Sequence, residues 1–555
     1  MKYLKLFENH TGYETYKNSQ DYLTPNVSYC VDRNEVHFEK YVRDYSKEYL
    51  TIEAIENGTI SFNIWKSMGT EYITSISYST DNGETWTTTN NTDNKSENLA
   101  ITVNVNEGDK VLWKGDAQQM GYYDSDDYGA NVGSFFSSTA EFNVYGNIMS
   151  LLYGDNFYGK TVLGYKCQFS YLFSNFDGET VCNVVNAANL SLPATTLADG
   201  CYQDMFSGCT SLTTAPELPA TTLSEDCYNN MFSECTSLTT APKLPATTLA
   251  ENCYSGMFLG CTSLAKAPEL PATTLADSCY FYMFYGCTSL TTAPELPATT
   301  LADSCYSNMF NGCTSLTKAP ELPATTLVNN CYNSMFRGCM LLATAPKLPA
   351  TILDVNCYSN MFNGCTSLTT APELPATTLA EHCYDNMFNG CTSLTTAPGL
   401  PATTLMHSCY SGMFEGCTSL TTAPELPATT LANYCYSNMF YGCTSLTTAP
   451  ELPATTLVNY CYSNMFYNCT SLTTAPELPA TTLVNNCYNL MFYGCSNLNY
   501  IKAMFTTTPS SSYTADWVNG VSSTGTFVKN GAATWNVTGV NGVPTGWTIV
   551  DTGKN

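Results

Sequence analysis

Basic residues are scarce in this sequence: 21 lysines and arginines stand against 47 aspartates and glutamates, and the formal net charge is −26 at pH 7. A nucleic-acid interface needs clustered Lys and Arg to displace the counterions of the phosphates, and an anionic membrane surface attracts the same residues. The charge balance therefore argues against nucleic acid and against an anionic membrane as partners.

Histidines and long apolar runs are also few. The four histidines have no nucleophile or base pattern around them, and the sequence has no glycine-rich phosphate loop. No run reaches the roughly 18 apolar residues of a membrane-spanning helix. Lys2, Lys5 and Glu8 interrupt the N-terminus, which therefore lacks the apolar core of a secretory signal. We expect no catalytic residues, no cofactor, no membrane insertion and synthesis in the cytoplasm.

What the sequence has in abundance is repetition. The text Cys-Tyr-x-x-Met-Phe-x-x-Cys recurs twelve times at steps of 26 residues, so the copies hold 24 of the 27 cysteines. The first cysteines of the copies are Cys201, Cys227, Cys253, Cys279, Cys305, Cys331, Cys357, Cys383, Cys409, Cys435, Cys461 and Cys487. A fixed period of this length predicts a solenoid, which adds hydrophobic core one copy at a time.

Each copy has a helix-like half and a strand-like half. Leu301, Cys305 and Met309 recur at every fourth position, which predicts one face of a short helix, and Gly312 sits where a helix C-cap glycine belongs. Residues 316–322 are expected to be extended, with prolines keeping any strand short. Strands stack at about 4.8 Å while a helix is about 10 Å wide, so we expect a curved right-handed solenoid with helices on its convex face.

The fold class we predict is an α/β solenoid preceded by a small N-terminal module and an all-β domain. Residues 48–147 alternate apolar and polar side chains over several short runs, which is typical of a β-sandwich. The predicted divisions are 1–47, an N-terminal attachment module; 48–147, an Ig-like β-sandwich spacer; 148–200, an N-terminal cap with a degenerate repeat; 201–499, the solenoid; and 500–555, a C-terminal cap.

The repeat text resembles a known family. The pattern L-P-x-x-x-x-L followed by Met-Phe-x-Gly-Cys-x-Ser-Leu resembles the BspA-like, or Treponema-type, leucine-rich repeats, whose core reads A-F-x-x-C-x-x-L. This sequence departs from that pattern by a longer period, by Met before the Phe and by an additional Cys. The resemblance implies surface adhesion and ligand recognition without catalysis.

The two ends of the chain resemble those of repeat proteins encoded by gut Bacteroidales and their prophages and phages. The text that carries this resemblance is M-K-Y-L-K-L-F-E-N-H near the start and D-W-V-N-G-V-S-S-T-G-T-F-V-K-N near the end. It implies a binder on a virion, a phage tail or a cell surface, with residues 1–47 contacting other virion proteins. The expected ligand is a host cell-surface glycan or protein.

The repeated cysteines and aromatics are expected to form the core. Cys is a small buried hydrophobe in this interpretation. The alternatives are disulfides, because neighbouring turns place like cysteines about 5 Å apart, and a metal ladder, which the eight-residue spacing disfavours. The Tyr after each first Cys and the Met-Phe pair are expected to pack inside. We expect no metal site in the repeats.

Two motifs in the predicted sandwich have functional alternatives. Residues 79–86, S-T-D-N-G-E-T-W, resemble the Asp-box of sialidases, but Asp-Asn-Gly is also an ordinary turn signal. A sialidase also needs three convergent arginines, and the three here fall in different modules. Asp124, Asp126 and Asp127 resemble the start of a calcium loop, although the EF-hand pattern then fails. We interpret both motifs as turns; sialidase activity and a calcium site are the alternatives.

The variable positions of the repeats indicate exposure. The residue after Met-Phe is Leu, Arg and Glu in different copies, which a packed core cannot accommodate. Tyrosines gather at this position and at the residue before the first Cys toward the C-terminal copies, and Tyr is favoured at binding surfaces. The candidate binding residues are Tyr285, Arg337, Tyr434, Tyr441, Tyr460, Tyr467 and Tyr493. Solvated drift is the alternative for these positions.

The sequence thus predicts a non-enzymatic recognition protein. The second hypothesis is a structural virion or assembly component with no ligand of its own, in which the solenoid is covered by other subunits. A glycoside hydrolase such as a sialidase is a remote third. Glutamates recur at one position of the strand-like half from Glu217 to Glu477, and we name them the acidic column. Lys243, Lys347 and Gly399 interrupt it. We interpret the acidic column as a solvated face, with cation bridging as the alternative.

Overall fold

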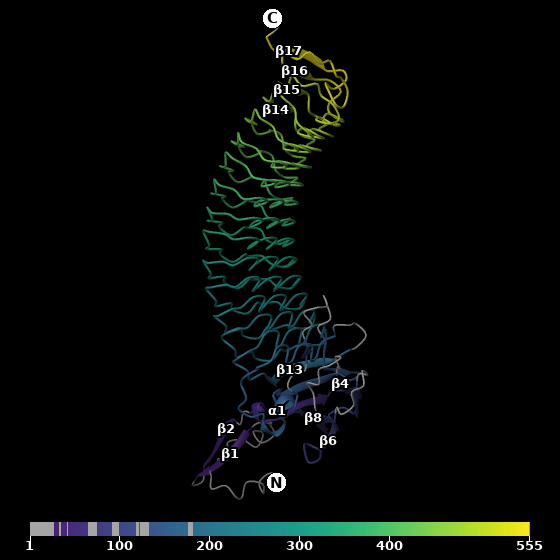
Figure 1. Cartoon of the computed structure of the whole chain (residues 1–555), viewed down its shortest axis with the longest axis vertical. Helices are drawn as coiled ribbons and strands as arrows, with labels where there is room; N and C mark the ends of the chain where they lie inside the picture. The colour runs from purple at the N-terminus through teal and green to yellow at the C-terminus, as the bar shows by residue number, and fades with distance from the viewer. Residues whose placement is uncertain are drawn as a thin grey trace.

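The computed structural model shows the repeats as a long stack of coils with a β-rich region at its N-terminal end (Figure 1). The residues it describes are 27–32, 35–40, 43–64, 75–90, 99–117, 121–122, 132–175 and 181–553. Most of the segment 1–42 and the three aspartates of the calcium hypothesis, Asp124, Asp126 and Asp127, lie outside these residues. Within the described part of that segment, β1 (Val27–Asp32) and β2 (Glu35–Lys40) form an antiparallel pair.

Two sheets build the β-rich region. One has the order β11-β4-β7 and the other β13-β12-β3-β8-β5-β6, while β9 and β10 pair with each other. Their bounds are β3 (Leu50–Ala54), β4 (Gly58–Ile64), β5 (Ser75–Ser79), β6 (Thr87–Asn90), β7 (Leu99–Val105), β8 (Lys110–Gly115), β9 (Gly121–Tyr122), β10 (Val132–Gly133), β11 (Phe135–Ser138), β12 (Phe142–Asn147) and β13 (Val184–Ser191). Side chains alternate between buried and half-buried along β8, as the period of two predicts.

Aromatic rings from the two sheets meet between them. Phe62 of β4 and Phe136 of β11 lie 4.8 Å apart, and Trp113 of β8 lies 5.2 Å from Phe136. All three side chains are fully buried. The β-rich region is therefore two sheets packed face to face, as the alternating pattern predicts.

The solenoid is joined directly to this region. Strand β13 pairs in parallel with β12, and Asn186 in β13 forms a parallel bridge with Thr214 of the first regular copy. The ring of Phe173 stacks on Phe136 at 5.2 Å and on Phe206 at 5.2 Å, so one file of phenylalanines runs from the sheets into the coils. The hydrophobic core is continuous across residues 148–200.

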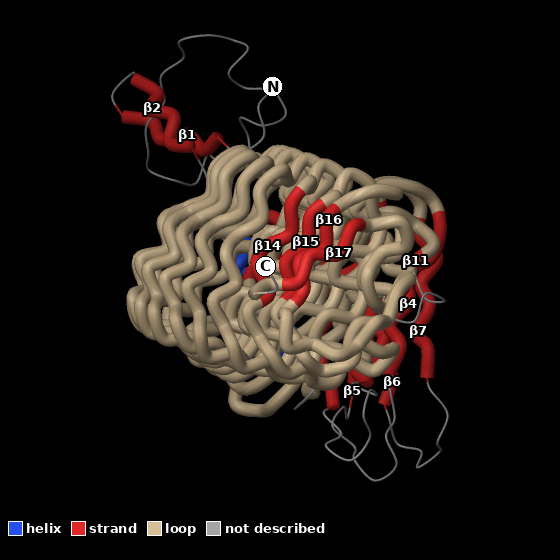
Figure 2. The backbone as a smooth tube through the Cα atoms, turned by 90° about the horizontal axis from the view of Figure 1, so that it is seen from above, coloured by secondary structure: helices blue, strands red, loops and turns tan. Residues whose placement is uncertain are grey.

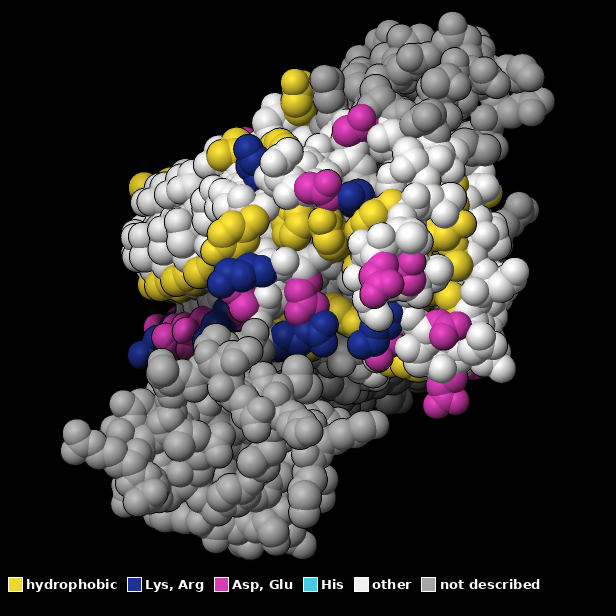
Figure 3. Space-filling view, turned by 90° about the horizontal axis from the view of Figure 1, so that it is seen from below, with side chains coloured by type: hydrophobic (Ala, Val, Ile, Leu, Met, Phe, Trp, Pro, Cys, Tyr) yellow, Lys and Arg dark blue, Asp and Glu magenta, His cyan; other side chains and the backbone are white. Residues whose placement is uncertain are grey.

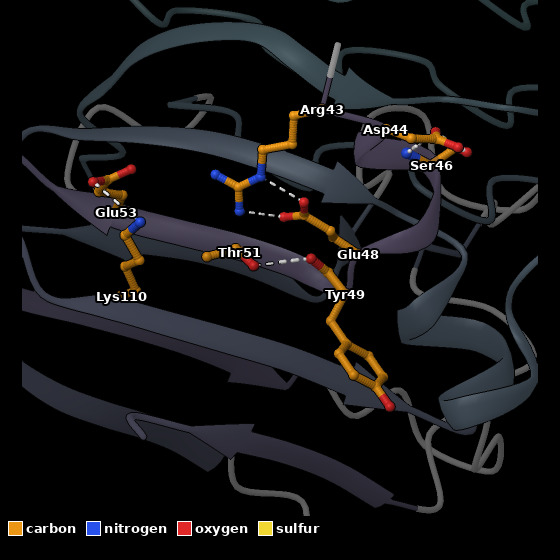
Figure 4. A network of polar contacts seen from close by, with 8 residues as sticks. All are labelled: Arg43, Asp44, Ser46, Glu48, Tyr49, Thr51, Glu53 and Lys110. Carbon is orange, nitrogen blue, oxygen red and sulfur yellow. Dashed lines mark hydrogen bonds and ion pairs between the residues drawn. The ribbon is translucent and has the colours of Figure 1, made fainter. Parts of the chain in front are cut away.

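A short polar network fastens the entry of the chain to the sheets (Figure 4). Arg43 and Glu48 flank the one-turn helix η3 (Tyr45–Lys47), and the guanidinium of Arg43 donates two hydrogen bonds to Glu48, each 2.5 Å long. Arg43 also lies over the rings of Tyr45 and Tyr145, and Lys110 is 3.6 Å from Glu53. The Arg43 contacts hold the segment against β12, an interior strand of the six-stranded sheet, and the Lys110–Glu53 contact joins β8 to β3.

The N-terminal end of the stack is closed by α1 (Ser150–Tyr153), η4 (Gly154–Asn156) and the loop that follows. Val162 of this loop bridges Thr196. Seen from this end, hydrophobic side chains gather in the middle of the face, with acidic and basic ones around them (Figure 3). Tyr158 and Tyr165 are 63% and 51% exposed.

The coils repeat with the predicted period. Parallel bridges join Thr292 to Lys318, and Thr370 to both Thr344 and Thr396, always 26 residues apart. The tyrosines after the first cysteines stack at 5.7–6.0 Å from Tyr202 to Tyr488, and the phenylalanines stack beside them. Tyr306, Met309 and Phe310 are buried, so the prediction that this stripe forms the core is confirmed.

The helix-like half is not a helix. From Ser304 to Cys313, alternate N–H groups close i→i−3 turns within the coil, as in Met309 N–H to Tyr306 C=O. The others bond to the next coil, as in Tyr306 N–H to Cys331 C=O. Every fourth residue has a left-handed φ, which an α-helix cannot contain. The predicted helix, and with it the helical reason for curvature, is therefore wrong, although its buried face was identified correctly.

The C-terminal end carries a regular parallel sheet of β14 (Thr474–Leu478), β15 (Tyr500–Ala503), β16 (Thr526–Lys529) and β17 (Thr548–Asp551). Viewed from above, these strands continue the stack of coils at its tip (Figure 2). Trp517 packs on Phe492, and Trp535 stacks on Phe505 at 5.3 Å. Tryptophan rings thus fill the end of the core, beyond the last repeat copy.

Candidate functional site

We call the stretch of each copy that corresponds to Ser304–Cys313 the turn segment. Three of its positions face outward, and we name them together the outward turn face. They are the residue before the first Cys, the residue before Met and the residue after Phe, for example Tyr434, Asn438 and Tyr441. Tyr434 is 37% exposed and the other two are half-buried, while Cys435, Tyr436 and Met439 between them are buried. All seven candidate residues, Tyr285, Arg337, Tyr434, Tyr441, Tyr460, Tyr467 and Tyr493, lie at these positions.

The backbone restricts two of the three positions. The residue before the first Cys and the residue before Met have φ of 50–62° in every copy. L-residues avoid this left-handed region, at a cost of about 1–2 kcal/mol each, and Gly, Asn and Asp tolerate it best. Gly, Asn, Asp and Ser accordingly occupy most copies. The repeat itself therefore selects small polar residues at these two positions.

Tyr434 and Tyr460 depart from this rule, as do Tyr282, His382 and Leu490. Tyr434 and Tyr460 have φ of 59° and 58°, where neighbouring copies carry Ser408 and Asn486. Their rings stack at 4.5 Å with planes 9° apart. A bulky residue in the left-handed region is an outlier, and outliers of this kind concentrate at functional sites. The fold does not need tyrosine here, because ten other copies close the same turn without it.

A second row of rings runs beside the first. Tyr441, Tyr467 and Tyr493 follow Phe in three successive copies, and their rings stack at 4.5 and 4.7 Å with planes 4° and 5° apart. Partial desolvation and the neighbouring phenols of Tyr441 and Tyr493 raise the pKa of Tyr467. We name Tyr434 and Tyr460 the first tyrosine ladder, and Tyr441, Tyr467 and Tyr493 the second.

Within a ladder the rings cover each other's faces. A ligand cannot insert between rings 4.5 Å apart, so it meets ring edges and hydroxyl groups. Tyr presents an apolar body with a polar tip in this arrangement, and packed rings lose little further freedom on binding. The arrangement suits an extended ligand that contacts several coils at once.

Two imidazoles extend the first ladder toward the N-terminus. His382 lies 5.1 Å from His407, and His407 lies 5.7 Å from Tyr434. Nδ1 of His382 is 3.7 Å from the Asp385 carboxylate, the pKa of which is raised by burial. The sequence alone gives these histidines no role, because their contact with Tyr434 depends on how the coils stack.

A further aromatic group contains Tyr285, which the sequence predicts, and two rings that it does not predict. In the fourth copy Tyr282 lies 4.2 Å from Phe281 and 5.2 Å from Tyr285, and we name these three residues the aromatic cluster. Tyr282 also has a left-handed φ, of 55°. Tyr285 is 38% exposed, and Arg337 is exposed two copies further on. A search for bulky residues at the left-handed positions would have found Tyr282.

The opposite half of each coil carries the acidic column. Glu373 and Glu425 are exposed on either side of Gly399, at a hollow of about 650 Å³ lined mainly by proline, alanine and leucine. Glu477 forms an ion pair with Lys502 at 2.9 Å. This face thus sets exposed carboxylates beside an apolar lining, and the described residues include no group of three or more possible metal ligands.

The Asp-box text forms a local turn. Asp81 accepts hydrogen bonds from the Ser79 hydroxyl at 2.7 Å and from the backbone N–H and hydroxyl of Thr85. The Thr85 bonds, assisted by Ser79, lower the pKa of Asp81 to about 2. Arg43, one of three arginines in the chain, is paired with Glu48. The carboxylate of Asp81 is thus used by the turn, as the turn interpretation predicts.

The cysteines have a part in the core that the sequence did not reveal. The second Cys of a copy donates its S–H to a carbonyl of the preceding copy, as in Cys313 to Phe284 O at 3.1 Å and Cys339 to Phe310 O at 3.2 Å. The repeat cysteines are fully buried. Burial raises the pKa of Cys391 and Cys443 to about 12, so both thiols keep the proton that this bond requires.

Stacked 26-residue coils, with leucine and cysteine inside and a variable face outside, define a leucine-rich-repeat solenoid. The model of the family described as "BspA type Leucine rich repeat region" matches residues 182–293, 228–369, 277–421 and 410–515, which together span more than half of the chain. The protein belongs to this BspA-type family. Leucine-rich-repeat proteins are typically scaffolds for binding and recognition.

Other comparisons add little. The crystal structure of a TLR13–ssRNA13 complex aligns with 63% of this chain and 45% of that chain, at 14% identity and a TM-score of 0.24. The match covers less than half of that protein, and at this similarity it carries no argument. A comparison with curated proteins finds no match. Among the described residues, no helix has the length and apolar character that crossing a bilayer requires.

Proposed function

We propose that this protein is a non-enzymatic recognition protein that attaches to a surface macromolecule through the outward turn face of its C-terminal copies. The N-terminal part would present the solenoid from a virion, a phage tail or a cell surface. One observation carries the proposal: bulky tyrosines occupy left-handed positions in two neighbouring copies, where the fold favours small polar residues.

The surrounding surface supports this assignment. Five tyrosines from three successive copies form two ladders, at positions seven residues apart in the copy. Tyrosines are frequent among the residues that dominate binding energy, because a rigid ring contributes contact area at a small entropic cost. Neighbouring coils repeat each contact, and many copies on one particle would multiply the avidity.

The proposal also assigns no catalytic role. General acid–base chemistry needs titratable groups positioned around a reacting atom. The titratable groups nearest the ladders are His407, whose ring lies 5.7 Å from Tyr434, and Glu415, which follows Met-Phe in the copy before Tyr441. The contact between His382 and Asp385, further from the ladders, is 3.7 Å long. Hydrolysis of sialosides and other glycosides is therefore expected to be undetectable.

The experiment is binding of the full-length chain to an array of printed glycans and extracellular proteins. The test variant replaces Tyr434, Tyr441, Tyr460, Tyr467 and Tyr493 with Ser. The matched control replaces exposed Tyr158 and Tyr165, which lie on the N-terminal loop. We expect every strong signal of the natural chain to fall at least tenfold in the test variant and to stay unchanged in the control.

Circular dichroism would verify that both variants keep the natural spectrum. Signals that survive in the five-tyrosine variant would contradict the proposal, and so would signals lost only in the Tyr158 and Tyr165 control. An array without any signal for the natural chain would favour the assembly component as the function.

A further inference from the structure

The aromatic cluster and the tyrosine ladders occupy the same positions of their copies. Tyr285 and Tyr441 both follow Met-Phe, six copies apart. With coils stacked at about 4.8 Å, the two aromatic groups are roughly 29 Å apart along the solenoid. Both include a tyrosine at a left-handed position, Tyr282 in one and Tyr434 in the other. The outward turn face therefore carries an aromatic group at each end of one continuous track.

Carboxamides line the track between these ends. The residues after Met-Phe include Asn311, Asn363 and Asn389. Nδ2 of each donates to the Oδ1 of the asparagine before Met in its own copy, at 2.9, 3.0 and 3.0 Å. The receiving asparagine is itself held, since Asn308 Nδ2 donates to Ser307 Oγ at 3.1 Å.

This relay orients each outer carboxamide before a ligand arrives. The Oδ1 and the second N–H of Asn311 stay outside the relay, so one acceptor and one donor remain for a ligand. Groups held in place by neighbouring hydrogen bonds bind with a smaller ordering cost. The same pair recurs in three copies, at the spacing of the coils.

Charge and backbone limit what the track can recognise. From Tyr285 to Tyr493, the residues after Met-Phe include one cation, Arg337, and one anion, Glu415, so their formal charges cancel in a chain of net charge −26. Along Ser304–Cys313 every N–H already bonds within the coil or to the next coil. A peptide strand would therefore find no backbone donor to pair with along this turn segment.

From these observations we infer that the ligand is an extended, uncharged polysaccharide lying along the solenoid axis between the aromatic cluster and the tyrosine ladders. The apolar faces and edges of its sugar rings contact the tyrosines at the two ends. Its hydroxyl groups, which donate and accept, pair with the carboxamides and with the guanidinium donors of Arg337. This inference rests on the proposed function and adds the ligand class and a second contact region.

The test is titration of the full-length chain with neutral polysaccharides, namely laminarin, mannan, dextran and xylan, and with their disaccharides and trisaccharides. An anionic polymer, polygalacturonate, and the extracellular protein collagen serve as the competing ligand classes. One variant combines Tyr282→Asn with Tyr285→Asn, and a second combines Tyr434→Asn with Tyr460→Asn. Asn occupies each of these positions in other copies, so the coils keep a residue that they already accommodate.

We expect at least one neutral polysaccharide to bind, and each double variant to weaken it at least tenfold. The Tyr158→Asn, Tyr165→Asn control should bind as the natural chain does. Disaccharides and trisaccharides are shorter than the track, so they should bind at least tenfold more weakly than the polymer. A disaccharide or trisaccharide cannot contact both ends of the track at once, so only one of the two double variants should weaken its binding.

The outcomes separate this inference from the proposed function. If only Tyr434→Asn with Tyr460→Asn weakens binding, the two-ended track is refuted and the proposed function stands. Binding of collagen or polygalacturonate alone, or of no neutral polysaccharide, overturns the ligand class. Polysaccharide binding that neither double variant changes overturns both.

Discussion

At the scale of single residues, the left-handed positions show which side chains the fold favours. The turn accepts Gly, Asn, Asp and Ser at these positions in most copies, whereas Tyr434 and Tyr460 bring large rings into the same conformation. We propose that recognition uses positions at which the fold gains nothing from a large side chain, so that the needs of the fold and of a ligand are separate.

This separation gives a stability prediction for Tyr434→Asn combined with Tyr460→Asn. Relief of left-handed strain stabilises the fold by up to about 1–2 kcal/mol per residue, and the lost ring pair costs about 0.5–1.5 kcal/mol. We expect the free energy of unfolding in a urea titration to fall by no more than about 1.5 kcal/mol, because relief of strain offsets the lost ring pair. A larger loss would show that the rings are structural.

Thiol chemistry is a second prediction at this scale. The S–H of Cys313 donates to Phe284 O, a bond that a disulfide or a metal would remove. We expect the native protein to react slowly with a maleimide, because burial raises the pKa of these thiols. After denaturation without reductant, most of the 27 cysteines should react. Fewer than half reacting would overturn the reduced core.

At the scale of the repeat element, the turn segment depends on left-handed backbone. Gly338 has a φ of 71°, and a Cβ added to it would lie 3.7 Å from the Cα of Gly312. Gly338→Ala should lower the free energy of unfolding by about 1–2 kcal/mol. Gly399→Ala is the matched control, since an added Cβ there meets no atom within 4 Å. Equal effects of the two substitutions would refute the turn assignment.

Within one repeat, the sequence predicts which side chains are buried but not the conformation of the backbone. The interval of four in Leu301, Cys305 and Met309 identified the inward residues, and all three are buried. It could not distinguish a helix from a chain of turns, because both return a side chain to the same side about every fourth residue. Asparagines at two variable positions were the missing signal, since they mark left-handed backbone rather than drift.

The candidate site was predictable in part for a similar reason. Tyr285 and Tyr441 were identified from their repeat positions, but ring stacking and the Asn308–Asn311 relay depend on side-chain geometry between and within coils. The contact of His407 with Tyr434 depends in the same way on neighbouring copies. Repeat text gives the position of a residue within a coil, and the stacking of coils decides its neighbours.

At the scale of the whole molecule, the core is a continuous file of buried thiols and phenols. Burial raises the pKa of Cys391, Cys443 and Cys495 to about 12, and the pKa of the buried tyrosines well above 10. An unfolded thiol titrates near pH 8.5. Since the folded pKa is raised, this contribution to stability is complete below about pH 8.5 and is lost as the pH rises toward 12.

We therefore expect the unfolding temperature to change little below about pH 7, where few unfolded thiols ionise, and to fall increasingly steeply above about pH 8. One pH unit above the unfolded pKa, each thiol destabilises the fold by about 1.4 kcal/mol. Scanning calorimetry with reductant present, from about pH 7 to 10.5, measures the effect. An unfolding temperature that is the same at both limits would contradict a core of protonated thiols.

If the outward turn face is the contact surface, a bound ligand shields its phenols from acetylation by N-acetylimidazole. The labelled tyrosines are identified by mass spectrometry with and without the strongest ligand of the glycan and protein array. We expect Tyr158 and Tyr165 to stay reactive and buried Tyr306 to stay unlabelled throughout. The ligand should protect the candidate tyrosines, which are Tyr285, Tyr434, Tyr441, Tyr460, Tyr467 and Tyr493. Protection of Tyr158 and Tyr165 alone, or of no tyrosine by a bound ligand, would contradict the proposed contact surface.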